Sequence, residues 1–169
     1  DIDLSDKAFP FMGYREGTVA GIKARIFRIS FTGELSFEIN VPRSYGLSLW
    51  QKLLDVGKKY EICPYGTEAM HVLRAEKGFI IVGQETDGTV TPVDLGMDWI
   101  ISKTKPDFIG KRALSRRDII KADRKQLVGL LTDNATDMLP EGSQIVEKVL
   151  PKPPMSMIGH VTSSYFSPN

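Results

Sequence analysis

The chain has 169 residues, 41% of them hydrophobic and 25% charged, which is enough for a folded core and excludes disorder as its main state. With 22 Lys and Arg against 21 Asp and Glu, the net charge of +1 excludes a global attraction to nucleic acid or membrane. A single cysteine, Cys63, excludes an internal disulfide framework and favours a reducing, cytoplasmic location.

Neither end of the sequence has the pattern of a natural chain terminus. The first four residues, DIDL, lack a Met and the pattern of a signal peptide. No apolar run approaches the roughly 20 residues that a membrane helix needs. Because the sequence also stops directly after a strand-like stretch, we expect both ends to be cuts in a longer chain.

Two strands are predicted first. Apolar and polar residues alternate over residues 23–30 and again over residues 36–41. The segment between them contains Gly33, which is typical of a hairpin connection. Pro42 ends the second strand.

Two helices follow. Residues 45–57 place apolar side chains at helical spacing, with Ser44 as a plausible N-cap. Residues 60–64 are predicted to be short and extended. A second helix is predicted from Thr67 to about residue 77, where Gly78 stops it. The order strand, strand, helix, strand, helix predicts an α+β fold with helices on one face of an antiparallel sheet.

The second half of the chain is less regular. Residues 83–96 are rich in Gly, Thr, Asp and Pro and predict a long loop, and residues 111–123 predict a basic helix. Three short strand candidates then follow, at 126–131, 143–149 and 155–163. We therefore place a domain boundary near residue 124, with residues 1–123 before it and an all-β region, residues 124–169, after it. Since three strands rarely form a stable unit alone, this region is expected to continue beyond the sequence.

Glu76 is the first candidate for chemistry. It lies at the C-terminal end of the second predicted helix, where the helix dipole disfavours a carboxylate. A ligand with two parallel N–H donors would compensate through bidentate hydrogen bonds. The alternative is a solvated Glu76 paired with Arg74 or Lys77, which is the usual state of a glutamate.

Two further segments carry weaker signals. Residues 28–38 form either an ordinary hairpin or part of a site. The stretch 103–125 can bind phosphates or an acidic tail, or it is simply a solvated face; its only aromatic residue is Phe108, so nucleic-acid binding is disfavoured. Its nine cations are Lys103, Lys105, Lys111, Arg112, Arg116, Arg117, Lys121, Arg124 and Lys125. His71 and His160 lie far apart, with no Cys or carboxylate at metal-ligand spacing, so no metal site is predicted.

The ordered segments RISFTGELSFEINVP, YGTEAMHVLRAEKGFIIVGQETDGTVTPVDLGMDWIISKTKPDFIGKRAL, LPEGSQIV and IGHVTSSYFSPN resemble the aminomethyltransferase family, which has the glycine-cleavage T-protein fold. Within that family they are similar to the C-terminal region of the α subunits of heterotetrameric sarcosine oxidases, and dimethylglycine dehydrogenases carry a similar module. The resemblance spans about residues 21–169. It implies that residues 1–123 are the C-terminal part of a folate-binding domain and residues 124–169 part of a C-terminal β-barrel.

The resemblance also implies a set of tetrahydrofolate-binding residues. RAEKG matches an Arg-x-Glu-x-Gly segment whose Glu binds the pterin ring, so Glu76 is the leading ligand, with Arg74 beside it. FTGELSFEI matches a hairpin beside the folate channel, where Phe31 replaces the usual Tyr and loses its hydroxyl while keeping a ring for stacking. MDWIISKTK implies Trp99 as a wall and Lys103 as the cation near the folate tail.

The function implied is to hold tetrahydrofolate while it accepts the one-carbon unit from oxidative demethylation of sarcosine, giving 5,10-methylenetetrahydrofolate. The site would orient the folate and shield it from water. In the family the catalytic acid and the dinucleotide region lie upstream and the flavin lies in another subunit, so no catalytic residue, flavin site or NAD site is assigned here. The expected partners are the β, γ and δ subunits of a sarcosine oxidase. We expect this piece alone to be inactive and to bind folate weakly.

Two alternatives remain open. One is a non-catalytic folate-binding or assembly module that docks other subunits through residues 103–125. The other is a glycine-cleavage-type aminomethyltransferase, against which Phe31 and the TDGTVTPVDLG loop argue mildly.

Overall fold

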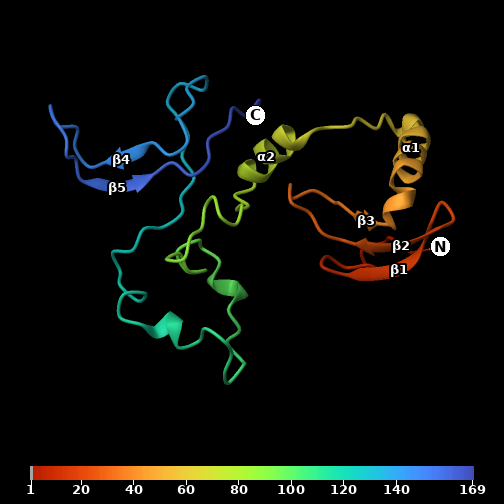
Figure 1. Ribbon diagram of the computed structural model, residues 1–169, viewed down its shortest axis with the longest axis horizontal. Helices are drawn as coiled ribbons and strands as arrows, with labels where there is room; N and C mark the ends of the chain where they lie inside the picture. Colours follow the sequence, from red (N-terminus) through yellow and green to blue (C-terminus); the bar gives the residue numbers. More distant parts are fainter. Residues whose placement is uncertain (1) are drawn as a thin grey trace. The chain divides into compact units, whose positions relative to one another are not determined.

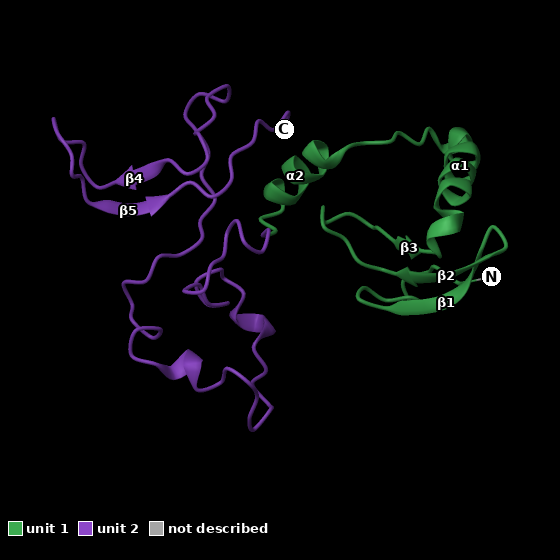
Figure 2. Ribbon diagram, in the orientation of Figure 1, with its two compact units in different colours: residues 1–79 green, residues 80–169 purple. Residues whose placement is uncertain are grey.

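A computed structural model describes residues 2–169 of the chain. They divide into two compact units, one ending at Phe79 and one beginning at Ile80 (Figure 2). No helix among the described residues is both long and apolar enough to cross a membrane.

The first unit contains a three-stranded antiparallel sheet in the order β1-β2-β3 (Figure 1). Its strands are β1 (Tyr14–Val19), β2 (Ile22–Phe27) and β3 (Glu38–Asn40). The predicted hairpin is confirmed, with Ile26 opposite Ile39. Strand β1 was not predicted. It reaches β2 through the two-residue turn Ala20–Gly21, whose φ values of 51° and 79° suit a tight hairpin turn.

The core of this unit lies on one face of the sheet. Ala24 and Ile26 point inward at period two and are buried together with Phe9, which is fully enclosed. Phe9 comes from the N-terminal loop, which Arg28 holds by donating a hydrogen bond from Nη1 to the Phe9 carbonyl at 2.7 Å and by pairing with Asp6 at 2.6 Å. The partly buried residues around the cluster are Ile2, Val19, Phe37, Ile39 and Val41. A loop phenylalanine therefore closes the core, a role that the sequence pattern did not predict.

Both predicted helices are confirmed. Two local predictions next to them, the N-cap Ser44 and the strand at 60–64, are wrong. The helical elements are η1 (Arg43–Tyr45), α1 (Gly46–Gly57), η2 (Lys58–Tyr60) and α2 (Thr67–Glu76). Ser44 is not the N-cap of α1, because the 3-10 turn η1 precedes the helix and moves the cap to Tyr45. Residues 60–64 do not form a strand, since η2 ends at Tyr60 and Glu61 adopts a left-handed φ of 57°.

Helix α2 ends in a Schellman motif. The Gly78 N–H donates to the Ala75 carbonyl at 2.9 Å, and the Phe79 N–H donates to the Arg74 carbonyl at 2.9 Å. Gly78 has a φ of 72°, which a residue with a side chain rarely adopts. The predicted stop at Gly78 is therefore confirmed, and it fixes the chain direction directly after Glu76.

The second unit contains one two-stranded antiparallel ribbon and much irregular chain. Its elements are η3 (Asp98–Ile100), η4 (Ala113–Ser115), β4 (Gln144–Val146) and β5 (Met157–His160). The strand predicted at 126–131 is not present, because the Leu127 N–H donates to the Asp94 carbonyl in a loop rather than to a strand. The barrel and the boundary near residue 124 stay predictions.

The predicted basic helix at 111–123 is wrong. Only the short turn η4 forms there, and nearly all of its neighbours are exposed. The pairs Arg112 and Arg116, and Arg117 and Lys121, would repel each other at i,i+4 spacing in a helix. Without an apolar face to bury, nothing offsets that repulsion.

Candidate functional site

The two segments of the first unit that the sequence analysis selected meet in space. In Figure 1 the connection between β2 and β3 reaches toward the end of α2. The contact is made by Lys77, whose side chain lies so close to Gly33 that a Cβ placed there would be 2.7 Å from both Cγ and Cδ of Lys77. The Lys77 ammonium also lies 3.9 Å from the Glu34 carboxylate. The FTGE turn and the RAEKG helix end thus form one surface.

The turn itself is fixed by local hydrogen bonds. The Ser30 hydroxyl oxygen accepts from the Gly33 N–H at 2.8 Å and from the Thr32 N–H at 3.3 Å. Gly33 has a φ of 87°, and Thr32 is buried. The positive φ favours glycine at position 33, and the flexible Lys77 side chain lies over the place that a Cβ would occupy.

Arg74 lies inside the unit. Its residue is only 2% exposed, and Nη1 donates to the Phe79 carbonyl at 3.0 Å. Because the Phe79 N–H also donates to the Arg74 carbonyl, two hydrogen bonds link these residues, one donated by each of them. Arg74 therefore stabilises the turn that follows α2.

Glu76 and Phe31 lie on the surface. Glu76 is the last residue of α2 and is exposed, and the Phe31 ring belongs to a residue that is 39% exposed. Both are accessible to a ligand. The exposure of Glu76 means that its immediate surroundings in this unit do not provide the shielding that the sequence analysis expected.

Trp99 and Lys103 belong to the second unit. Trp99 lies in η3 and is 73% exposed, and Lys103 is exposed in the irregular chain that follows. Their assignment to a folate wall and a folate tail stays a prediction.

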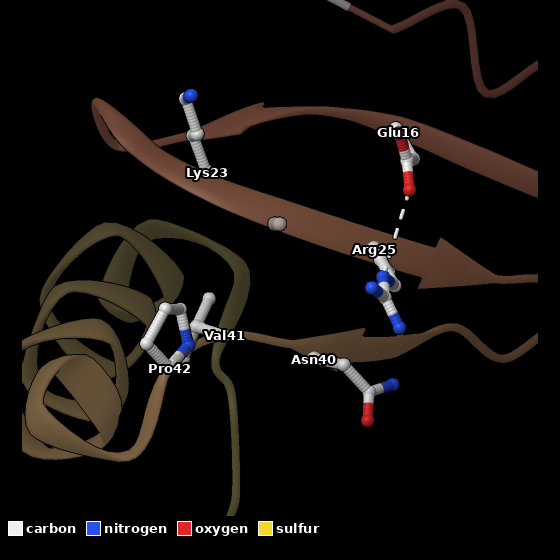
Figure 3. Close-up of a pocket in the computed structure, with 7 residues that line it drawn as sticks. Glu16, Lys23, Arg25, Asn40, Val41 and Pro42 are labelled. Atoms are coloured by element: carbon white, nitrogen blue, oxygen red, sulfur yellow. Dashed lines mark ion pairs between the residues drawn. The ribbon is translucent and has the colours of Figure 1, made fainter.

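A cavity of about 450 Å³ lies over the sheet in the first unit (Figure 3). Its lining includes the ion pair of Arg25 and Glu16, whose Nε and Oε1 are 3.6 Å apart and whose side chains are 69% and 64% exposed. Such an exposed ion pair contributes little to stability. The full lining is Glu16, Lys23, Ala24, Arg25, Asn40, Val41 and Pro42, which includes none of the predicted folate residues.

The second unit is organised by a buried ion pair that the sequence analysis missed. Both oxygens of the Asp94 carboxylate are engaged by Arg124, Oδ1 by Nε at 2.8 Å and Oδ2 by Nη2 at 2.5 Å. Asp94 also accepts from the Thr91 N–H at 2.8 Å and from the Thr91 hydroxyl at 2.9 Å. Arg124, and after it Thr91, hold the pKa of Asp94 well below its usual range, and Asp94 raises the pKa of Arg124. This pair ties the loop 83–96 to the chain near residue 124.

A second polar cluster joins the same loop to the chain after β5. The Gln84 side-chain amide donates to the Thr162 carbonyl at 2.9 Å and to the Ser163 hydroxyl at 2.9 Å. The Ser163 hydroxyl in turn donates to the buried Glu85 carboxylate. Glu85 also accepts from the Ile81 N–H at 2.7 Å. These groups satisfy one another, as buried polar groups must, and we assign them a structural role.

Comparison with known proteins gives a family match. The GCVT N-terminal domain matches residues 1–105. The chain is 52% identical, over 99% of its length, to the sarcosine oxidase subunit alpha of Corynebacterium sp. (strain U-96). It is 34% identical over 99% of its length to an aminomethyltransferase of Thermoanaerobacter sp. (strain X514), and 34% identical over 85% to the mitochondrial dimethylglycine dehydrogenase of Mus musculus.

These matches confirm the resemblance read from the sequence motifs. The chain spans 18% of the length of the sarcosine oxidase subunit, 43% of the aminomethyltransferase and 16% of the dehydrogenase. The similarity therefore concerns one region of each relative.

Proposed function

The chain belongs to the family of the GCVT N-terminal domain, and from this premise we propose that it contributes to the tetrahydrofolate site of a one-carbon enzyme. One observation carries the proposal. The two motifs that the resemblance assigns to folate binding, far apart in the sequence, meet at the Gly33–Lys77 contact in the structure.

The chemistry of the meeting point fits the pterin of tetrahydrofolate. The exposed Glu76 carboxylate has two acceptor oxygens for the paired N–H donors of an amino-pyrimidinone edge. The accessible Phe31 ring can stack on a flat heterocycle. Bound tetrahydrofolate would supply the nitrogen nucleophiles that accept a one-carbon unit.

Arg74 serves the site indirectly in this proposal. Its bond to the Phe79 carbonyl stabilises the turn after α2 and with it the position of the Glu76 backbone. Trp99 and Lys103 are kept as candidates for the folate wall and tail. Their exposure leaves both side chains accessible to a ligand.

We further propose that the parent reaction is that of a sarcosine oxidase, whose other subunits oxidise sarcosine and deliver the one-carbon unit. The identity of 52% to a sarcosine oxidase subunit alpha supports this over a glycine-cleavage-type aminomethyltransferase, to which the identity is 34%. The flavin and NAD sites are assigned to parts of the enzyme outside this chain.

The test is a calorimetric titration of the full chain with folinic acid, comparing Glu76→Gln with Glu68→Gln. Glu68 is the matched control, because it is an exposed glutamate in the first turn of the same helix. Losing one charge-assisted, bidentate contact of about 1.5–3 kcal/mol weakens binding by roughly 10- to 150-fold. We expect this loss for Glu76→Gln alone. Absence of binding by the unmodified chain, or equal effects of both changes, would refute the proposal.

A further inference from the structure

Lys77 is held at its position by its carbon chain more than by its charge. Three of its carbons, Cγ, Cδ and Cε, lie 2.7, 2.7 and 2.8 Å from the place that a Cβ on Gly33 would occupy. The stem therefore lies directly on the glycine. Its ammonium is 3.9 Å from Glu34, and the two side chains are 49% and 55% exposed, so the ion pair itself contributes little.

The two turns that this contact joins are each fixed independently. On one side, the Ser30 hydroxyl holds the backbone of Gly33. On the other, the Schellman motif and the Arg74–Phe79 bonds fix the backbone after α2. A contact between two fixed turns sets the distance between the residues next to it, here Phe31 and Glu76.

We propose that Lys77 is a positioning residue of the folate site, whose aliphatic stem, packed on Gly33, holds the β2–β3 turn against the end of α2. This proposal rests on the proposed function. Lys77 would set the spacing between the stacking ring of Phe31 and the carboxylate of Glu76, without itself touching the pterin. A side chain at position 33 would then have to displace the Lys77 stem, in addition to adopting the left-handed backbone angle.

The contact can be tested without folate by hydrogen exchange at the Gly33 amide in the full chain. Lys77→Ala removes the stem, and Lys77→Met keeps most of it without the charge. We expect exchange at Gly33 to rise at least tenfold in Lys77→Ala and to stay within twofold of the unmodified chain in Lys77→Met. A rise in both variants would mean that the charge carries the contact, and no rise in either would mean that there is no contact to lose; both results would overturn the proposal.

Gly33→Ala tests the other side of the contact, with Gly21→Ala as its control. Both glycines have positive φ, 87° and 79°, but nothing lies within 4 Å of a Cβ at position 21. The two variants therefore share the backbone strain and differ in the clash. We expect faster exchange over residues 31–35 in Gly33→Ala only, and the same exchange there in both variants would count against the proposal.

The positioning role is tested by folinic acid titration of the same variants. We expect Lys77→Ala to weaken binding at least fivefold with an unchanged unfolding temperature, and Lys77→Met to restore it. Normal affinity in Lys77→Ala would overturn the positioning role and leave the proposed function intact. No binding by the unmodified chain would instead overturn the proposed function and, with it, any role of Lys77 in the site.

Discussion

Replacing Asp94 with Asn should open the second unit locally. Asp94 is 5% exposed, and its carboxylate accepts two hydrogen bonds from Arg124 and two from Thr91. Asn keeps the shape of the side chain but removes the charge and presents an NH₂ group where Arg124 or Thr91 needs an acceptor.

The size of the effect follows from the burial of the pair. Breaking a buried ion pair by removing one partner destabilises by about 3–5 kcal/mol, because the other charge stays buried. The Arg124 side chain is 20% exposed and also donates to the carbonyls of Thr89 and Asp118, so it keeps some compensation. We therefore expect the low end, about 3 kcal/mol, which is roughly a 150-fold change in the opening equilibrium.

Hydrogen exchange at the Leu127 amide measures this opening, since that amide donates to the Asp94 carbonyl at 2.8 Å. We expect its protection to fall by roughly 150-fold in Asp94→Asn, as the opening free energy drops by about 3 kcal/mol. Asp87→Asn is the control, because Asp87 lies in the same loop and its carboxylate accepts from nearby Thr89 in an exposed turn that Asn also supports. Unchanged protection in Asp94→Asn, or an equal loss in Asp87→Asn, would refute the assignment of Asp94 as the organising residue.

Two further outcomes are expected. Arg124 lowers the pKa of Asp94, so the stabilisation from the Asp94 carboxylate is fully present above its ordinary pKa of 3.8 and is lost as the pH falls below that value. In the unmodified chain, protection of the Leu127 amide should therefore drop below about pH 4. In Asp94→Asn this protection should depend less on pH in the same range. Phe9→Ala should destabilise the first unit by about 3–5 kcal/mol in urea unfolding because Phe9 is fully buried, whereas Phe11→Ala, at a residue 63% exposed, should change stability by less than about 0.5 kcal/mol.

The elements that the sequence predicted are those with a local period. The β2–β3 hairpin and helices α1 and α2 each carry their own alternating or helical apolar pattern, and Gly78 supplies its own stop signal. Strand β1 was missed because its sequence, YREGTV, has no clear alternation and its pairing depends on a neighbour. The helix predicted at 111–123 rested on local composition alone. Many helix-forming residues lie there, but they do not form an apolar face.

The long-range contacts could not be predicted from the sequence, for a different reason. Gly33 and Lys77 meet, and Asp94 meets Arg124, across long stretches of chain. Neither pair has a spacing or motif that reveals its partner in a single sequence. The motifs identified Glu76 and Phe31 as candidates, but only the fold brings their segments together.

The Arg-x-Glu segment holds two charged residues, and helix geometry separates their roles. Residues two apart on a helix do not share a face, so Arg74 and Glu76 cannot both turn toward one ligand. Burial distinguishes them, since Arg74 is 2% exposed and bonded to Phe79 while Glu76 is exposed. The Glu76 residue is exposed on the surface, whereas a ligand could reach Arg74 only by breaking the turn after α2. The motif therefore pairs an inward residue that fixes the helix end with an outward, exposed residue.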